Sequence, residues 1–225
     1  MSSSTSSTTL TSSSFQDEIN HPKTSGHIEL IMGCMFAGKT SELMRRVKRY
    51  NVSGKHCLVI KYSKDNRYLE MTTDSTNPND SNKDVPKLPK IATHDKNFMD
   101  AISVDQLSEV KQWELYDVIG VDEGQFFPDL VEFCDYAADQ GKVVIVSALD
   151  GTFQQKPFQQ IADLIPKAET VDKLSAVCMR CFKNATFTKR IGSETEIEII
   201  GGMDKYIAVC RECLHYYDQT TQIKN

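Results

Sequence analysis

No apolar run in the sequence approaches the roughly 18 residues that a membrane-spanning helix needs. The N-terminus lacks the apolar core of a secretory signal. It contains no arginine and carries Asp17 and Glu18, which argues against a transit peptide. We therefore expect a soluble, cytoplasmic protein. In a reducing compartment, the seven cysteines are expected to be free thiols or metal ligands rather than disulfides.

The sequence also lacks an excess of positive charge. Its formal net charge is -5, from 31 acidic and 26 basic residues, whereas nucleic-acid-binding domains usually carry a basic balance or a basic stripe. The longest basic cluster runs from Arg45 to Arg49 and is typical of the solvated face of a helix. The composition therefore disfavours a nucleic-acid-binding protein.

Two polar segments stand apart from the rest of the sequence. Residues 1–25 are rich in Ser and Thr and cannot bury enough apolar area to offset the entropy of ordering, so a disordered tail is expected. Residues 72–90 contain Asn, Asp, Lys and three prolines, a composition that predicts a flexible surface insertion. Residues 218–225 are expected to form a short C-terminal tail.

Between these segments, short apolar stretches alternate with amphipathic ones. Strands are predicted over 27–32, 57–61, 116–121 and 143–149, and helices over 39–51, 104–113 and 129–140. Strands that alternate with helices imply a parallel sheet covered on both faces, which is an α/β fold. After Leu174, paired cysteines and short β segments, such as 186–189 and 196–200, indicate a small second module.

One loop matches the phosphate-binding pattern G-x-x-x-x-G-K-[ST], between a predicted strand and a predicted helix. Its residues are Gly33, Cys34, Met35, Phe36, Ala37, Gly38, Lys39 and Thr40. In such loops, backbone N–H groups and the helix N-terminus bind phosphate oxygens. Lys39 is expected to reach the β- and γ-phosphates, and Thr40 to supply a hydroxyl to Mg²⁺. A chance match in an ordinary strand–turn–helix is the alternative, and the motif does not distinguish a kinase from an ATPase.

Two acidic residues, Asp122 and Glu123, end the apolar stretch that precedes them. In P-loop sheets a carboxylate at the end of a strand holds Mg²⁺, and this predicts that role for Asp122. Glu123 is then available as a general base. Acids also end many strands without any catalytic role, but the pairing with the phosphate loop favours the functional interpretation. An ATPase would use the same glutamate to activate water.

Two C-x-x-C pairs, Cys178/Cys181 and Cys210/Cys213, are separated by 28 residues. This spacing is typical of a four-cysteine zinc site, in which each pair turns tightly enough for two thiolates to share one ion. Four thiolates saturate a tetrahedral ion, so the zinc is expected to be structural. A redox dithiol, or a site in which His215 replaces one cysteine, are alternatives that the paired spacing disfavours.

Several longer stretches resemble the type II thymidine kinases, a family of cellular and poxviral-like enzymes. The resemblance extends from Gly26 to about Tyr217 apart from 72–90, and its most specific segments are 33–46, 61–68, 122–129, 148–153 and 201–206. It implies a RecA-like P-loop kinase domain with a central parallel sheet over 26–173. It also implies a small β-rich zinc-binding domain with a lasso loop over 174–217. The implied activity is transfer of the ATP γ-phosphate to the 5′-hydroxyl of deoxythymidine or deoxyuridine, for pyrimidine deoxynucleotide salvage.

The resemblance implies roles for individual residues. Glu123 is the expected base for the 5′-hydroxyl proton, and Arg190 is expected near the transferred phosphate. Asp65, Asn66 and Arg67 are expected beside the nucleotide phosphates. Gln125 is expected to supply a side-chain amide to the nucleotide site. The expected thymine pocket contains Met35, Leu149, Phe153, Phe158, Thr188 and Tyr206, with backbone groups of Ile197, Glu198, Ile199, Ile200 and Gly201. Without the family, Phe153 would be interpreted as a core residue.

The same resemblance implies ATP and Mg²⁺, one structural Zn²⁺, feedback by dTTP and a homotetramer, with neither nucleic acid nor a membrane as partner. The sequence departs from the family at two places: Cys34 stands where members commonly have proline, and 72–90 is an extra segment. A P-loop ATPase and a zinc-ribbon nucleic-acid module are the alternative functions. The acidic balance counts against the second.

Overall fold

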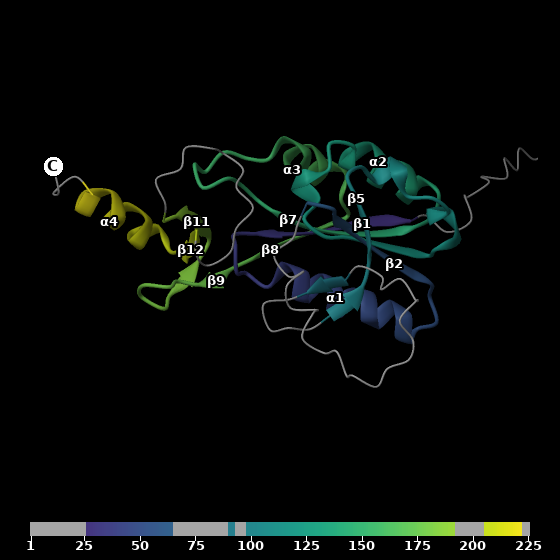
Figure 1. The fold of residues 1–225 in the computed structure, drawn as a ribbon, viewed down its shortest axis with the longest axis horizontal. Helices are drawn as coiled ribbons and strands as arrows, with labels where there is room; N and C mark the ends of the chain where they lie inside the picture. The colour runs from purple at the N-terminus through teal and green to yellow at the C-terminus, as the bar shows by residue number, and fades with distance from the viewer. Residues whose placement is uncertain (1–25, 65–89, 93–97, 192–204, 222–225) are drawn as a thin grey trace, which may run out of the picture.

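A six-stranded parallel sheet forms the centre of the computed structural model, which describes residues 26–64, 90–92, 98–191 and 205–221 (Figure 1). Its strands are β1 (His27–Gly33), β2 (Cys57–Tyr62), β5 (Ile102–Val104), β6 (Val118–Val121), β7 (Val143–Leu149) and β8 (Thr170–Leu174). The strand order is β5-β2-β6-β7-β1-β8, and every neighbouring pair is parallel. All strands therefore end at the same edge of the sheet, where ligands bind in open α/β folds.

Helices cover both faces of this sheet. Figure 1 shows α1 (Lys39–Val52) on one face, and α2 (Leu130–Asp139) and α3 (Gln159–Leu164) on the other. In β1, Leu30 packs in the core cluster that includes α2 and α3, whereas Ile31 packs with Leu43 of α1. Successive side chains of a strand point to opposite faces, so both faces of the sheet are apolar. The predicted α/β fold class is confirmed.

The segment after β5 differs from the prediction. The expected helix over 104–113 is wrong, because β5 ends at Val104 and is followed by two short 3-10 helices, η2 (Leu107–Glu109) and η3 (Trp113–Leu115). Leu107, Val110 and Trp113 are buried, but the segment is not one helix, because its backbone is extended at Val110 and left-handed at Gln112, with φ of 59°. The Asp129 carboxylate accepts hydrogen bonds, at 3.1 and 2.8 Å, from two backbone N–H groups of η2. These tertiary contacts hold the short turn against the start of α2.

Several elements lie where no helix or strand was predicted. The edge strand β8 is mostly exposed, and its sequence TVDKL lacks the apolar run that identifies a buried strand. Helix α3 has only six residues and continues into η5 (Ile165–Lys167). An antiparallel hairpin of β3 (Lys90–Ala92) and β4 (Phe98–Asp100) begins inside the predicted 72–90 insertion. The rest of that insertion and the predicted tail over 1–25 lie outside the described residues.

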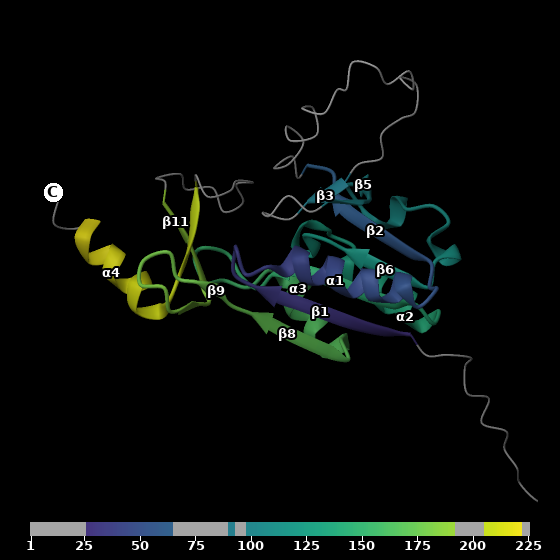
Figure 2. The same cartoon turned by 90° about the horizontal axis from the view of Figure 1, so that it is seen from below.

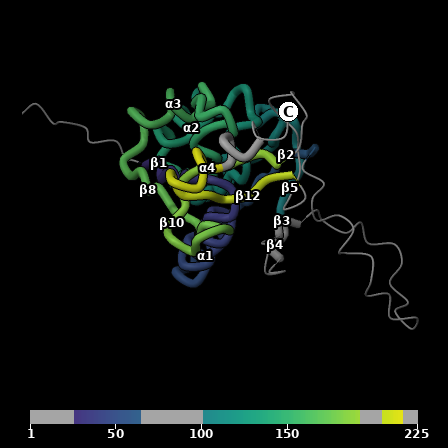
Figure 3. The backbone as a smooth tube through the Cα atoms, turned by 90° about the vertical axis from the view of Figure 1, so that its left-hand side faces the viewer, coloured from purple at the N-terminus to yellow at the C-terminus, as the bar shows by residue number. Residues whose placement is uncertain are grey.

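The chain beyond β8 forms a second unit of short elements, which we call the cysteine module. Its elements are β9 (Ala176–Val177), β10 (Asn184–Ala185), β11 (Phe187–Arg190), β12 (Tyr206–Val209) and α4 (Arg211–Thr221). Strand β9 pairs with β10, and β11 with β12, both antiparallel. The arrowheads of β1 and β8 point toward this module in Figure 2, and Figure 3 views the molecule from the side of α4. The module therefore lies at the edge of the sheet where the strands end.

Two predictions at the C-terminal side fall partly outside the structure. The β segment over 196–200 lies outside the described residues, and α4 continues to Thr221, past the predicted start of the tail at 218. Within the described ranges, no helix is both long and apolar enough to cross a membrane.

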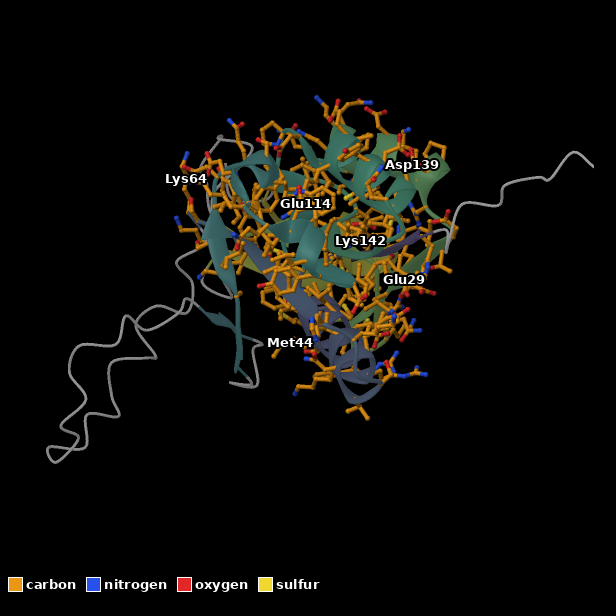
Figure 4. All side chains as sticks on the ribbon, turned by 90° about the vertical axis from the view of Figure 1, so that its right-hand side faces the viewer. Glu29, Met44, Lys64, Glu114, Asp139 and Lys142 are labelled. Atoms are coloured by element: carbon orange, nitrogen blue, oxygen red, sulfur yellow. The ribbon has the colours of Figure 1, made fainter. Side chains whose placement is uncertain are left out.

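At the opposite edge of the sheet, where the strands begin, a hydrogen bond joins the segment before β7 to η3. Lys142, just before β7, donates a 2.6 Å hydrogen bond from Nζ to the backbone carbonyl of Glu114 in η3. Both residues are labelled in Figure 4, which views the molecule from this end. The phosphate loop and the acidic pair lie at the other edge.

Candidate active site

The phosphate loop connects the end of β1 to the start of α1. Its backbone enters the left-handed region at Phe36, with φ of 65°, and at Gly38, with φ of 79°. At Gly33 the chain passes very close to β8, since a Cβ there would lie 2.4 Å from the carbonyl oxygen of Leu174. A loop of this kind depends on such conformations to wrap its backbone around a phosphate.

Lys39 and Thr40 begin α1 and place polar groups at this loop. Lys39 is buried, and its Nζ donates a 2.9 Å hydrogen bond to the carbonyl oxygen of Cys34, so the amine lies against the loop backbone. The hydroxyl of Thr40 lies 3.1 Å from Oδ1 of Asp122. The first turn of α1 adds the positive end of the helix dipole. The predicted phosphate-binding side chains therefore lie together.

Asp122 follows β6 and is fixed from two sides. Its carboxylate accepts hydrogen bonds from the hydroxyls of Thr40 and of Ser147 in β7. Its backbone N–H donates a 2.9 Å hydrogen bond to the carbonyl of Ile60 in β2. A carboxylate beside a hydroxyl offers the oxygen ligands that Mg²⁺ prefers. These two side chains fit a Mg²⁺ site next to the phosphate loop.

Sequence reasoning did not identify Ser147. It is the one polar residue of the apolar strand β7, and it is fully buried. A buried hydroxyl needs a hydrogen-bond partner. A single serine in an otherwise apolar strand therefore indicates a polar partner nearby, and the acidic pair after the preceding strand could supply it. Its partner here is Asp122, so Ser147 orients the carboxylate expected to hold Mg²⁺.

Glu123 begins a tight turn that leads into η4 (Gly124–Phe126). Its backbone is left-handed, with φ of 55° and ψ of 43°, a conformation that costs a non-glycine residue about 1 kcal/mol or more. Its carboxylate accepts a 2.5 Å hydrogen bond from Nε2 of Gln125. The other end of that amide, Oε1, accepts a 3.0 Å hydrogen bond from the N–H of Leu149. The amide of Gln125 thus orients the Glu123 carboxylate against the end of β7.

A second group of predicted residues gathers around Arg190 in β11. The guanidinium carbon lies 4.0 Å from the centre of the Phe153 ring, and Nη2 donates a 2.6 Å hydrogen bond to the hydroxyl of Tyr206. Thr188 lies on the same face of β11, two residues earlier, and accepts a 3.0 Å hydrogen bond from the N–H of Met35. The structure therefore brings Phe153 against two strands of the cysteine module, β11 and β12, and joins β11 to the phosphate loop.

The other residues of the expected site fall into two groups. Leu149 and Phe158 belong to the main core cluster of the sheet, on the side of α2 and α3. Asp65, Asn66 and Arg67, and the segment 197–201, lie outside the described residues. Their expected roles stay predictions.

The four paired cysteines converge in the cysteine module. Their Sγ atoms all lie within 4.8 Å of one another, and those of Cys181 and Cys210 are 3.5 Å apart. Tetrahedral Zn–S bonds of about 2.3 Å place sulfur atoms about 3.8 Å apart. The cluster is therefore compatible with one tetrahedral ion held by Cys178, Cys181, Cys210 and Cys213. Among the described side chains, His215 is exposed and is not part of this cluster.

Comparison with known proteins covers the same region. The thymidine kinase family model matches residues 26–214. The chain is 53% identical to the thymidine kinase of variola virus over 189 aligned residues. The aligned region covers 84% of this chain and 96% of the viral protein. The same values hold for the thymidine kinase of vaccinia virus strain Western Reserve. The cytosolic thymidine kinase of Homo sapiens is 52% identical over 192 residues, which is 85% of this chain and 74% of the human one.

Proposed function

The chain belongs to the thymidine kinase family, and we propose that the site described above transfers the γ-phosphate of ATP to the 5′-hydroxyl of deoxythymidine. The observation that carries the proposal is the position of the buried Glu123 carboxylate, beside Asp122 and the phosphate loop at one edge of the sheet. The product is dTMP, and deoxyuridine is a second substrate. The process is pyrimidine deoxynucleotide salvage for DNA synthesis.

The phosphate loop is the proposed site for the ATP phosphates. Its backbone N–H groups and the ammonium of Lys39 offset the charge of the β- and γ-phosphates. Lys39 is held against the loop by its hydrogen bond to the carbonyl of Cys34, so its amine lies beside the backbone that is proposed to bind the phosphates. By family resemblance, Asp65, Asn66 and Arg67 are proposed to bind the same phosphates.

Thr40 and Asp122 would hold Mg²⁺, with Ser147 fixing the carboxylate of Asp122. When bound, Mg²⁺ offsets charge on the β- and γ-phosphate oxygens and helps to align them for transfer. The protein's own part is to present a hydroxyl and an oriented carboxylate at the start of α1 and the end of β6.

Glu123 is the proposed general base. As the 5′-oxygen forms its bond to the γ-phosphorus, the proton of the 5′-hydroxyl moves to a carboxylate oxygen of Glu123. The bond from the γ-phosphorus to the oxygen that bridges it to the β-phosphorus breaks, and ADP leaves. Gln125 keeps the carboxylate in one orientation, which matters because phosphoryl transfer depends mainly on positioning.

The nucleoside is proposed to bind between the sheet edge and the cysteine module. Arg190 is held by the ring of Phe153 and the hydroxyl of Tyr206, so its guanidinium has a fixed orientation. Its proposed role, by family resemblance, is to contact the transferred phosphate. The pocket also includes Met35, Leu149, Phe158 and Thr188. Backbone groups of residues 197–201 hydrogen-bond the base.

The remaining proposals concern the metal, the domains and the assembly. The four cysteines would hold a structural Zn²⁺, which supplies cross-linking rather than chemistry. The domain division follows the sequence, with a kinase domain over 26–173 and a zinc-binding domain over 174–217. A homotetramer, feedback inhibition by dTTP and a cytoplasmic location are proposed from the family resemblance, and one relative is named cytosolic.

A panel of nucleosides tests the proposed substrate. Phosphorylation by ATP is measured with deoxythymidine, deoxyuridine, deoxycytidine and the purine deoxynucleosides in turn. We expect turnover of the first two only, because backbone donors and acceptors from 197–201 cannot exchange places. Cytosine would present a donor to a donor and leave buried groups unpaired. Comparable turnover of deoxycytidine would contradict this account of the pocket.

A further inference from the structure

Three consecutive residues of the phosphate loop touch the cysteine module or the strand that leads into it. Gly33 lies so close to the last residue of β8 that a Cβ would be 2.4 Å from that residue's carbonyl oxygen. The thiol of Cys34 donates a 3.4 Å hydrogen bond to the carbonyl of Ala185 in β10. The N–H of Met35 donates a 3.0 Å hydrogen bond to the hydroxyl of Thr188 in β11. The loop is therefore supported from outside its own domain.

This contact is buried and continuous with the cysteine cluster. Cys34 and Ala185 have no exposed surface, and they belong to the same buried cluster as Cys178 and Cys210. Phe36 of the loop packs against that cluster. Burial raises the pKa of the Cys34 thiol, so the thiol keeps the proton that it donates. One core runs from the phosphate loop to the proposed metal site.

We propose that Thr188 is a positioning residue for the phosphate loop, and that the folded cysteine module thereby sets the affinity for ATP. Met35 is buried, with 7% of its surface exposed, and a buried N–H must find an acceptor. The hydroxyl of Thr188 is that acceptor and fixes the path of the loop. This inference rests on the proposed ATP site, and it differs from the role in the thymine pocket that the family resemblance implies for Thr188.

The two roles predict different kinetic effects. A residue that only contacts thymine changes the KM for deoxythymidine and leaves ATP binding intact. A residue that holds the loop changes ATP binding even in the absence of a nucleoside, because only the fraction of molecules with a correctly held loop binds ATP well. Coupling between two sites is also reciprocal. If the module strengthens ATP binding, ATP strengthens metal binding by the module to the same degree.

The first test compares Thr188→Val, which removes the hydroxyl, with Thr188→Ser, which keeps it. The ATP dissociation constant is measured without nucleoside, together with the metal content of each protein. We expect about tenfold weaker ATP binding for Thr188→Val, the effect of leaving one buried N–H unpaired, and near wild-type binding for Thr188→Ser. Normal ATP binding by Thr188→Val, with only a raised KM for deoxythymidine, would overturn the inference. A wild-type protein that does not bind ATP would instead refute the proposed function.

The second test uses the wild-type protein, so it does not depend on the folding of a variant. The affinity for Zn²⁺ is measured by competition with a chromogenic chelator, with and without saturating ATP and Mg²⁺. We expect ATP to tighten Zn²⁺ binding about tenfold or more, because loss of the metal would release the Thr188 contact together with the other contacts of the module to the loop. The control is Lys39→Ala, which removes the main phosphate contact, so any direct effect of ATP on free Zn²⁺ appears there too. Equal Zn²⁺ affinity with and without ATP in the wild-type protein would overturn the inference.

Discussion

The side-chain amide of Gln125 donates a 2.5 Å hydrogen bond to the carboxylate of Glu123 and accepts one, at 3.0 Å, from the N–H of Leu149. The amide therefore connects the proposed base, at the end of β6, to the end of the neighbouring strand β7. Because the second contact is to the backbone, the position of the carboxylate depends on the sheet itself. This relationship leads directly to two predictions about turnover.

Glu123→Gln is expected to bind ATP normally, because Lys39, Thr40 and the loop backbone are unchanged. Turnover should fall roughly 10²-fold or more, as for the loss of a general base. Steady-state kinetics at saturating ATP and deoxythymidine measure this. Asp122→Asn is the comparison, since it should raise the Mg²⁺ concentration needed for half-maximal rate. Near-normal turnover by Glu123→Gln would remove Glu123 from the role of base.

Gln125→Leu is expected to lower kcat about tenfold while leaving the KM for ATP close to normal, because it frees the carboxylate from its orientation without touching the phosphate loop. The matched control is Gln140→Leu, which replaces an exposed glutamine after α2 and should change neither constant. If Gln125→Leu instead raised the KM for ATP and left kcat unchanged, Gln125 would be a nucleotide ligand, as the family resemblance first suggested.

The parts of this site that the sequence predicted are those encoded by neighbouring residues. The phosphate loop, the acidic pair after β6 and each C-x-x-C pair consist of residues that lie within a few positions of one another in the sequence. Their spacing alone therefore indicates what they bind. The α/β class followed from alternating segments. The helix over 104–113 was wrong because the spacing of the apolar residues Leu107, Val110 and Trp113 also fits a helix, whereas the backbone is extended at Val110 and left-handed at Gln112.

The relationships that the sequence did not predict join residues far apart in the chain. The hydrogen bond from Met35 to Thr188 spans 153 positions, and that from Ser147 to Asp122 spans 25. Neither has a local motif, because each depends on which strand ends the fold brings together. The edge strand β8 was missed for a different reason, since an exposed and charged strand has no apolar signature.

Cys178→Ser is expected to lose bound Zn²⁺ and to unfold the cysteine module, since a structural zinc contributes on the order of 10 kcal/mol to a small site. Metal analysis and thermal unfolding measure the two effects. Cys57→Ser is the matched control, because Cys57 lies in β2, outside the quartet, and should keep the metal. Purified, active wild-type protein without zinc would show that the quartet has another role.

Glu42 predicts a dependence of stability on pH. Hydrogen bonds from Arg45, and then from Arg46, hold the pKa of the Glu42 carboxyl at about 2, below its ordinary value of 4.5. Because the pKa is lower in the folded state, the stabilisation is present above about pH 4.5 and is lost as the pH falls toward 2. The difference in Tm between the wild type and Glu42→Gln should therefore be constant near neutral pH and shrink in acid.

The control for this prediction is Glu109→Gln, at an exposed glutamate of η2. Its effect on Tm should be small at every pH. A difference between the wild type and Glu42→Gln that grows on acidification would mean that the ion pairs of Glu42 do not stabilise the fold.

The fate of the γ-phosphate tests the central claim most directly. With γ-labelled ATP, the wild-type protein and deoxythymidine, we predict one labelled dTMP for each ATP consumed, and no consumption of ATP when the nucleoside is left out. This outcome follows if Glu123 takes its proton from a bound 5′-hydroxyl rather than from water. Release of labelled inorganic phosphate at the same rate with and without deoxythymidine would contradict the account and identify an ATPase.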